Sequence, residues 1–293
     1  MVNSFVTLSR TVTIEKCYVP KYCAIASVPQ PLLQAKHPVS DALLPVIAVT
    51  NDTLFAGRLI CRQPREGYRF SMDAVLAAHF AAPKPRQRVL DLGCGCGVIG
   101  LVLAYRHPQT TVCGIELQPD LAELAYANIR DNGYAQRYTI RQGDIRSIAT
   151  LVTPESFDLV VANPPYRKKQ TGRQNKDDQA AHARHELLGG IEDFVRAAAF
   201  AVKNRGKVSF IYPARRCNTL LAALHGHRLT PKRLQPVYSY PGAAGACLVL
   251  LEAVKNGGEQ LDILAPFFIY QRRNGTYTPA MQALYEEDEC LPR

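Results

Sequence analysis

The chain has 293 residues, of which 47% are hydrophobic, and a formal net charge of +10 at neutral pH. No apolar run reaches the ~18 residues of a membrane-spanning helix, so we expect a soluble protein without membrane contact. The nine cysteines contain no Cys-x-x-Cys pair, which favours reduced thiols in a cytoplasmic protein over a zinc site or a disulfide framework. The basic charge indicates a polyanionic partner such as nucleic acid.

The chain divides into an extension and one folded domain. Residues 1–50 mix polar and apolar positions without a helical period and contain recurrent prolines but few acids, so we expect them to be poorly ordered. The domain is expected over residues 51–293. It would comprise a hairpin and a helix at 51–85, a core sheet at 86–255 and a C-terminal segment at 256–293.

A glycine-rich loop follows the apolar run at 88–92. Glycines let the backbone approach a ligand closely and lead into a helix whose N-terminus can face it. Residues 95–100 satisfy the G-x-G-x-x-G fingerprint of dinucleotide-binding proteins. The overlapping pattern of Asp91, Gly93, Gly95 and Gly97 is instead typical of methyltransferases that use S-adenosylmethionine. Asp91 favours the second interpretation, because a carboxylate suits the cationic end of an amino acid and repels phosphates.

Acidic residues follow the next two expected strands. Glu116 ends the strand at 111–115, where a carboxylate can accept hydrogen bonds from both hydroxyls of a ribose. Asp144 comes shortly after the strand at 138–141 and could accept from the amine of an adenine. The alternative for Asp144 is a loop residue that caps the next turn.

A reactive turn, Asn163-Pro164-Pro165-Tyr166, follows a fourth strand at 157–162. The prolines lack backbone N–H groups, so the turn offers carbonyl acceptors with few competing donors. Together with the Asn163 side chain and the Tyr166 ring, these acceptors suit a planar amino group on a conjugated substrate. The alternative is a plain turn after a strand. In a parallel doubly wound sheet, this turn and the preceding loops would share one ligand-binding edge.

A basic segment without clear periodicity continues from this turn. Its length is unusual for a connection within a compact domain, which indicates function or disorder. We expect it to act as a lid that contacts RNA phosphates, and the alternative is a solvated surface loop. The expected RNA-binding residues are Arg167, Lys168, Lys169, Arg173 and Lys176.

In their order along the chain, these motifs resemble class I methyltransferases. The sequence Gly67-Tyr68-Arg69-Phe70-Ser71-Met72-Asp73, the glycine loop, the two acids, the Asn-Pro-Pro-Tyr turn and residues 206–213 carry the resemblance. More narrowly, residues 51–280 resemble the bacterial N6-adenine methyltransferases that modify adenosine-37 of valine tRNA. The resemblance implies an α/β fold with a Rossmann-like, doubly wound, seven-stranded sheet whose last strand is antiparallel.

The resemblance also implies a cofactor, a substrate and a site. The cofactor would be S-adenosyl-L-methionine, and the partner a tRNA with an accessible anticodon-loop adenosine. We expect a monomer without a metal. Asn163 and the Pro164 carbonyl would accept from the target amine, with Pro165 completing the turn and Tyr166 stacking on the base. The residues expected to contact the cofactor are Tyr68, Arg69, Ser71, Asp73, Asp91, Gly93, Gly95, Gly97, Glu116, Asp144 and Asn163.

Four other functions remain open from the sequence. Glutamine N5-methyltransferases of translation factors carry the same turn, although they usually have a different N-terminal substrate domain. An rRNA N6-adenine methyltransferase would use the same chemistry. A nucleotide-binding oxidoreductase or an inactive RNA-binding module would share only part of these features, and cofactor identity would separate it from the others.

Overall fold

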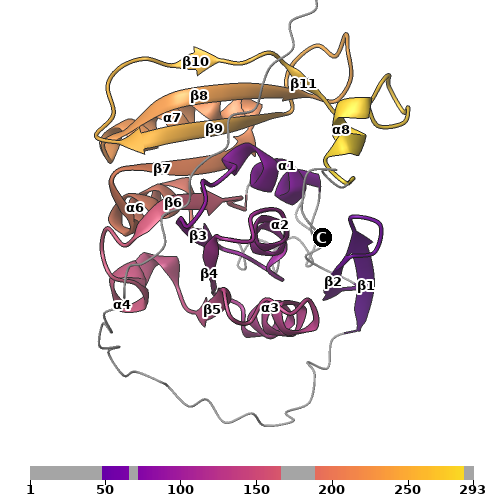
Figure 1. Ribbon diagram of the computed structural model, residues 1–293. Coiled ribbons are helices and arrows are strands. Elements are labelled where there is room, and N and C mark those ends of the chain that lie inside the picture. The colour runs from indigo at the N-terminus through magenta and orange to yellow at the C-terminus, as the bar shows by residue number, and fades with distance from the viewer. Residues whose placement is uncertain (1–47, 66–71, 166–188, 287–293) are drawn as a thin grey trace, which may run out of the picture. The chain divides into compact units, whose positions relative to one another are not determined.

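The computed structural model describes residues 48–65, 72–165 and 189–286 (Figure 1). All of them belong to one compact unit, which begins at Leu43. Most of the expected extension therefore lies outside the described residues, and β1 begins at Val49, close to the expected start of the domain. None of the described helices is long and apolar enough to cross a membrane.

The N-terminal elements are a hairpin and a helix. Strands β1 (Val49–Leu54) and β2 (Leu59–Pro64) pair antiparallel. The turn between them includes Gly57, whose φ of 88° is in the left-handed region that glycine adopts without strain. Helix α1 (Met72–Ala81) is followed by Pro83, which cannot continue a helix because it has no N–H to donate.

Five parallel strands form the centre of the main sheet, in the spatial order β5, β4, β3, β6, β7. The three inner strands β3, β4 and β6 are covered by helices on both faces, so nearly all of their residues are buried. The strands are β3 (Arg88–Leu92), β4 (Thr111–Glu116), β5 (Tyr138–Gln142), β6 (Phe157–Ala162) and β7 (Val202–Pro213).

The C-terminal strands complete one side of the open sheet. Strand β9 (Leu248–Lys255) lies between β7 and β8 (Leu229–Tyr238) and is antiparallel to both. This arrangement confirms the predicted doubly wound, seven-stranded sheet with an antiparallel last strand. The structure adds two short strands, β10 (Asp262–Ile263) and β11 (Phe267–Phe268), which pair in parallel with β8.

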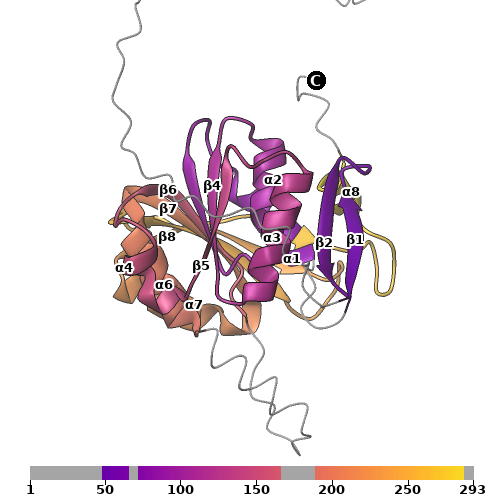
Figure 2. The ribbon, with the colours of Figure 1, turned by 90° about the horizontal axis from the view of Figure 1, so that it is seen from below.

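Helices cover the two faces of the sheet in separate layers (Figures 1 and 2). Helices α1, α2 (Val98–Arg106) and α3 (Pro119–Asp131) lie on one face, and α4 (Ile148–Leu151), α6 (Ile191–Ala201) and α7 (Cys217–Gly226) on the other. Each layer has its own buried core because strand side chains alternate: Val161 joins the first core and Val160 the second. The shorter elements are η1 (Ile145–Ser147), η2 (Ala214–Arg216) and α8 (Pro279–Ala283).

The sheet order creates a switch point between β3 and β6. The chain leaves β3 for α2 on one face and leaves β6 for α6 on the other. Loops that diverge in this way leave a crevice at the carboxyl ends of the two strands, which is where ligands bind in open α/β sheets.

Candidate active site

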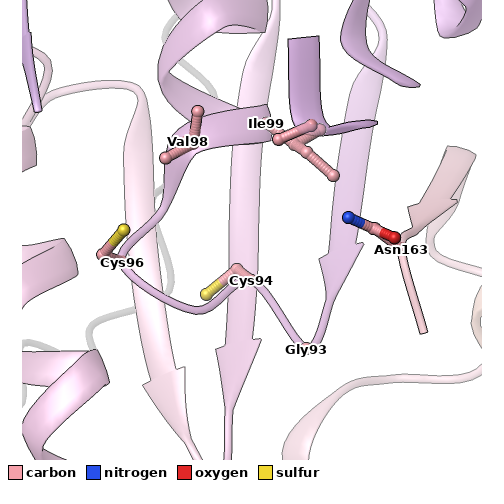
Figure 3. A pocket seen from close by; sticks show the side chains of 7 residues that line it. Gly93, Cys94, Cys96, Val98, Ile99 and Asn163 are labelled. Atoms are coloured by element: carbon pink, nitrogen blue, oxygen red, sulfur yellow. The ribbon is translucent and has the colours of Figure 1, made fainter. Parts of the chain in front are cut away.

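Gly93 and Asn163 flank this switch point. Leu92 and Ala162 are register partners at the ends of β3 and β6, so the next residue of each strand opens into the crevice. A pocket lies here, and the side chain of Asn163 lies across from Ile99 and the loop that begins at Gly93 (Figure 3). Its lining residues are Ala74, Gly93, Cys94, Cys96, Val98, Ile99 and Asn163.

The glycine loop has the backbone that its sequence predicts. Gly93, Gly95 and Gly97 all have positive φ, at 67°, 57° and 88°, a region that side chains with a Cβ rarely adopt. At Gly93 a Cβ would also lie 3.1 Å from the ring of Phe194. The loop is further fixed by the N–H of Cys94, which donates to the carbonyl of Ile115 on β4 at 3.0 Å.

Gly100 lets α2 pack closely against β5, and this packing explains the glycine without a ligand. A Cβ at this position would lie 2.2 Å from Cζ of Tyr138. The Tyr138 ring is fully buried against α2, and its hydroxyl donates to the Gly97 carbonyl at 3.2 Å. The last glycine of the G-x-G-x-x-G pattern thus brings α2 onto β5, and the formal match to a dinucleotide fingerprint has a packing explanation here. The sequence placed Tyr138 in a strand but did not indicate that its ring packs against Gly100.

Two buried carboxylates lie beneath the loop. Asp91 on β3 is completely buried, and neither of its carboxylate oxygens has a hydrogen-bond partner of normal geometry among the described residues. Burial raises the pKa of Asp91 to about 7; the backbone N–H of Gly100 opposes this rise, and the negative charge of Glu116 adds to it. An uncompensated buried carboxylate is costly, so this site favours a bound cation.

Glu116 is oriented by the loop itself. Its Oε2 accepts from the N–H of Gly95 and its Oε1 from the N–H of Gln118, both at 2.8 Å. Burial raises the pKa of Glu116, while these two N–H groups oppose the rise. Each carboxylate oxygen has a second lone pair, so Glu116 can hold the loop and still accept from a ligand hydroxyl.

Asn163 presents a buried acceptor to the pocket. Its Oδ1 is shielded from solvent and has no hydrogen-bond partner among the residues that the structure describes. The next residue, Pro164, is buried and Pro165 is half-buried. A buried amide oxygen without a donor is rare in a folded protein and indicates a ligand group that supplies one.

Asp144 caps the short helix η1. Its side chain accepts from the backbone N–H of Arg146 at 2.8 Å and forms an ion pair with the Arg146 guanidinium. The hydrogen bond from this guanidinium is the main cause that lowers the pKa of Asp144. The capping alternative therefore describes its contacts in the structure, and adenine binding by Asp144 remains a prediction.

The other predicted positions divide into two groups. Asp73 lies in the first turn of α1, beside the pocket residue Ala74, and is buried. The remaining predicted contacts lie outside the described residues, namely Tyr68, Arg69, Ser71, Tyr166, Arg167, Lys168, Lys169, Arg173 and Lys176.

An asparagine that sequence reasoning missed connects the site to the hairpin. Asn128 on α3 is completely buried, and its Nδ2 donates to the Cys96 carbonyl of the glycine loop at 2.9 Å. The same amide accepts from the N–H of Arg62 at 2.7 Å and donates to the Arg62 carbonyl at 2.9 Å. Asn132, one turn later, pairs with the N–H and carbonyl of Ile60 in the same way. Their i, i+4 spacing on an amphipathic helix is the one sequence signal for this role.

The chemistry of the pocket fits S-adenosyl-L-methionine. A pyrophosphate at the N-terminus of α2 would be repelled by the buried Asp91 carboxylate. The unpartnered Asp91 carboxylate matches a cationic amino group, and Glu116 is placed for ribose hydroxyls. No group of three or more potential metal ligands occurs in the ranges that the structure describes.

Comparisons with known proteins agree with this geometry. The family model "Methyltransferase small domain" matches residues 72–211. A tRNA1(Val) (adenine(37)-N6)-methyltransferase of Porphyromonas gingivalis is 35% identical over 179 residues, which is 59% of this chain and 69% of that protein. The chain belongs to this methyltransferase family. A second member of the tRNA1(Val) (adenine(37)-N6)-methyltransferase family, from Haemophilus influenzae, is 31% identical over 50% of this chain and 62% of its own.

Solved structures support the methyltransferase fold. A predicted O-methyltransferase from Agrobacterium tumefaciens superposes with a TM-score of 0.60 at 24% identity, over 73% of this chain and 95% of that one. TYW2 of Pyrococcus horikoshii, solved in complex with MeSAdo, superposes with a TM-score of 0.52 at 17% identity, over 71% and 72% of the two chains. At identities of 24% and 17%, these superpositions show a shared fold and no more.

Proposed function

We propose that this protein transfers a methyl group from S-adenosyl-L-methionine to the exocyclic N6 of adenosine-37 in valine tRNA. The names of its relatives in the family support this substrate. The net charge of +10 also supports a polyanionic partner. We further propose that the enzyme acts in the cytoplasm as a monomer without a metal.

The observation that carries the proposal is the buried, unpartnered Oδ1 of Asn163 at the switch point. The nitrogen of an aromatic amine is a poor nucleophile because its lone pair is delocalised into the ring. As the nitrogen begins to bond to the methyl group it acquires positive charge, and its N–H groups become stronger donors. An acceptor that is already in place stabilises this charge without reorganising. The Pro164 carbonyl would provide the second acceptor.

The cofactor would be held by the two carboxylates and the glycine loop. When bound, S-adenosyl-L-methionine supplies an electrophilic methyl group. Asp91 would bind its cationic amino end, and Glu116 would accept from its ribose hydroxyls. Gly95 donates to Glu116. This hydrogen bond would therefore hold the loop and the ribose-binding carboxylate in fixed relative positions.

The proposal is tested with purified protein, S-adenosyl-L-methionine and a valine tRNA transcript. We expect nucleoside mass spectrometry to detect N6-methyladenosine in this transcript and none in a matched transcript with guanosine at position 37. Methylation of a glutamine in a translation factor, with no methylated adenosine in tRNA, would contradict the proposal. Binding of NAD without binding of S-adenosyl-L-methionine would contradict it as well.

A further inference from the structure

A long stretch of the chain contains no acidic residue. From Phe194 to Leu251 there is no aspartate or glutamate, although this stretch includes part of α6, strands β7 and β8, and helix α7. Its lysines and arginines are Arg196, Lys203, Arg205, Lys207, Arg215, Arg216, Arg228, Lys232 and Arg233. Any acidic side chain that pairs with these cations must therefore lie outside the stretch.

Most of these cations already have protein partners. Four form ion pairs with acids outside the stretch: Arg196 with Asp193, Lys203 with Asp158, and both Lys207 and Arg233 with Glu252. Two others donate to backbone carbonyls, Arg205 to Asn256 and Lys232 to Gln260. Within the described part of the chain, Arg215, Arg216 and Arg228 form no ion pair.

Arg215 and Arg216 lie at the ligand-binding edge. They belong to η2, which directly follows the carboxyl end of β7. Strand β7 is the parallel neighbour of β6, with Ala162 opposite Phe210, so both strands end at the edge that carries Asn163. Arg228 differs, because it precedes the first residue of β8 and therefore lies at the opposite edge of the sheet.

The two arginines differ in how they are held. The Arg216 guanidinium stacks over the ring of Tyr212 at 5.4 Å, and Arg216 is half-buried. Stacking fixes the guanidinium plane, so less conformational entropy is lost when its N–H groups bind a ligand. Arg215 is exposed. One held and one adaptable guanidinium therefore lie at the edge of the sheet that carries Asn163.

We propose that Arg215 and Arg216 bind phosphate groups of the RNA strand next to the target adenosine. This inference rests on the proposed function, since it assigns a phosphate-binding site to the same substrate. A guanidinium can donate two parallel hydrogen bonds to a phosphate, and neither arginine has an ion pair to break first. This site is separate from the RNA-binding residues predicted at 167–176, because it follows β7 at the same edge of the sheet.

The test compares Arg215→Gln/Arg216→Gln with Arg228→Gln. Arg228 is also exposed and without an ion pair, but it lies at the far edge. Affinity for the valine tRNA transcript is measured by fluorescence anisotropy at several salt concentrations. We expect the double variant to bind roughly tenfold to a hundredfold more weakly, with a log K against log salt slope that is smaller by about 1–2 units. Arg228→Gln should retain the wild-type slope, and S-adenosyl-L-methionine affinity should be unchanged in both variants.

The outcomes separate this inference from the proposed function. A wild-type slope in the double variant, or an equal loss in Arg228→Gln, overturns the phosphate site while tRNA methylation by the wild-type protein still stands. A wild-type protein that binds tRNA through these arginines but forms no N6-methyladenosine overturns the proposed function alone. If the double variant has a lowered melting temperature, the exposed single variant Arg215→Gln is used, with an expected slope change of about one unit.

Discussion

At the scale of single residues, the site is marked by polar atoms that the protein leaves without partners. The Asp91 carboxylate and Asn163 Oδ1 are both buried, and neither has a hydrogen-bond partner of normal geometry among the described residues. Buried polar groups in folded proteins are normally paired, because an unpaired group loses its hydration without compensation. Asn163 lines the pocket, and Asp91 lies on β3 two residues before the pocket residue Gly93.

The first prediction concerns Asn163. Replacing it by alanine removes an acceptor whose hydrogen bond strengthens as the target nitrogen becomes positive. We expect Asn163→Ala to slow single-turnover methyl transfer by roughly two to three decades, or about 3–4 kcal/mol. The affinity for S-adenosyl-L-methionine should stay near that of the wild type. A variant with normal single-turnover rate and only a raised KM would show that Asn163 contributes to binding rather than to the transition state.

The second prediction concerns Asp91 and pH. Its pKa of about 7 in the folded protein lies above its ordinary value of 3.8, so the folded state holds a proton that the unfolded chain releases. The stability of the ligand-free protein should therefore fall as pH rises from about 4 to 7. Asp91→Asn should abolish this part of the decline and stabilise the protein above pH 7 by at most about 4 kcal/mol.

Urea unfolding at pH 5 and pH 8 measures this effect. Asparagine has nearly the same shape as aspartate, so packing is retained in the comparison. The same substitution should weaken S-adenosyl-L-methionine binding, because the amino end of the cofactor loses its counter-charge. An identical difference between pH 5 and pH 8 in the wild type and in Asp91→Asn would refute the assignment.

At the scale of elements, α3 holds the hairpin and the glycine loop in place. Asn128 bonds to both, whereas Asn132 bonds to the hairpin and to the backbone of α3 but not to the glycine loop. The amide of Asn128 behaves as a short strand edge, since it accepts from the N–H and donates to the carbonyl of one residue of β2. The hairpin is thereby fixed to the cofactor loop through the helix.

The third prediction separates these two contacts. Asn128→Ala leaves buried backbone groups of Arg62 and Cys96 without partners, so we expect a loss of about 2–4 kcal/mol of unfolding free energy. We also expect weaker cofactor binding. The matched control Asn132→Ala, whose contacts with the hairpin are exposed, should cost about 1 kcal/mol and leave cofactor affinity unchanged. Equal cofactor affinities in the two variants would contradict a role of Asn128 in positioning the loop.

At the scale of the whole molecule, the compact unit that contains the described residues begins at Leu43. Its first strand begins at Val49 and pairs in register with Pro64 of β2. We therefore expect residues within the strand, but not those before Leu43, to contribute to the stability of the domain.

The fourth prediction concerns truncation at these two points. Deleting residues 1–42 should leave the melting temperature and the cofactor affinity unchanged. Deleting residues 1–50 should lower the melting temperature, because it removes Val49 and Thr50 from the β1–β2 ladder. Thermal denaturation monitored by circular dichroism measures both. A large destabilisation by the shorter deletion would show that the extension packs on the domain.

The sequence by itself determined the central parallel strands and their order along the chain. The strand at 88–92, the glycine loop, Glu116 and the turn at Asn163 were predicted at their observed positions, because strand periodicity and glycine or proline chemistry are local properties of the chain. The order of these strands implied one shared edge, and in the structure Gly93 and Asn163 follow paired strand ends and line one pocket there. The residues predicted from 66 to 71 and from 166 to 188 remain predictions.

Only the tertiary structure decided which groups support the site. Three contacts join residues that are distant in sequence, namely Tyr138 under Gly100, Asn128 with the hairpin and the loop, and Lys207 with Glu252. Their roles follow from burial and from the identity of the nearest partner, and neither property is encoded in a local pattern. Sequence indicates which side chains are chemically able to bind, but packing determines which of them are left without a partner in the protein.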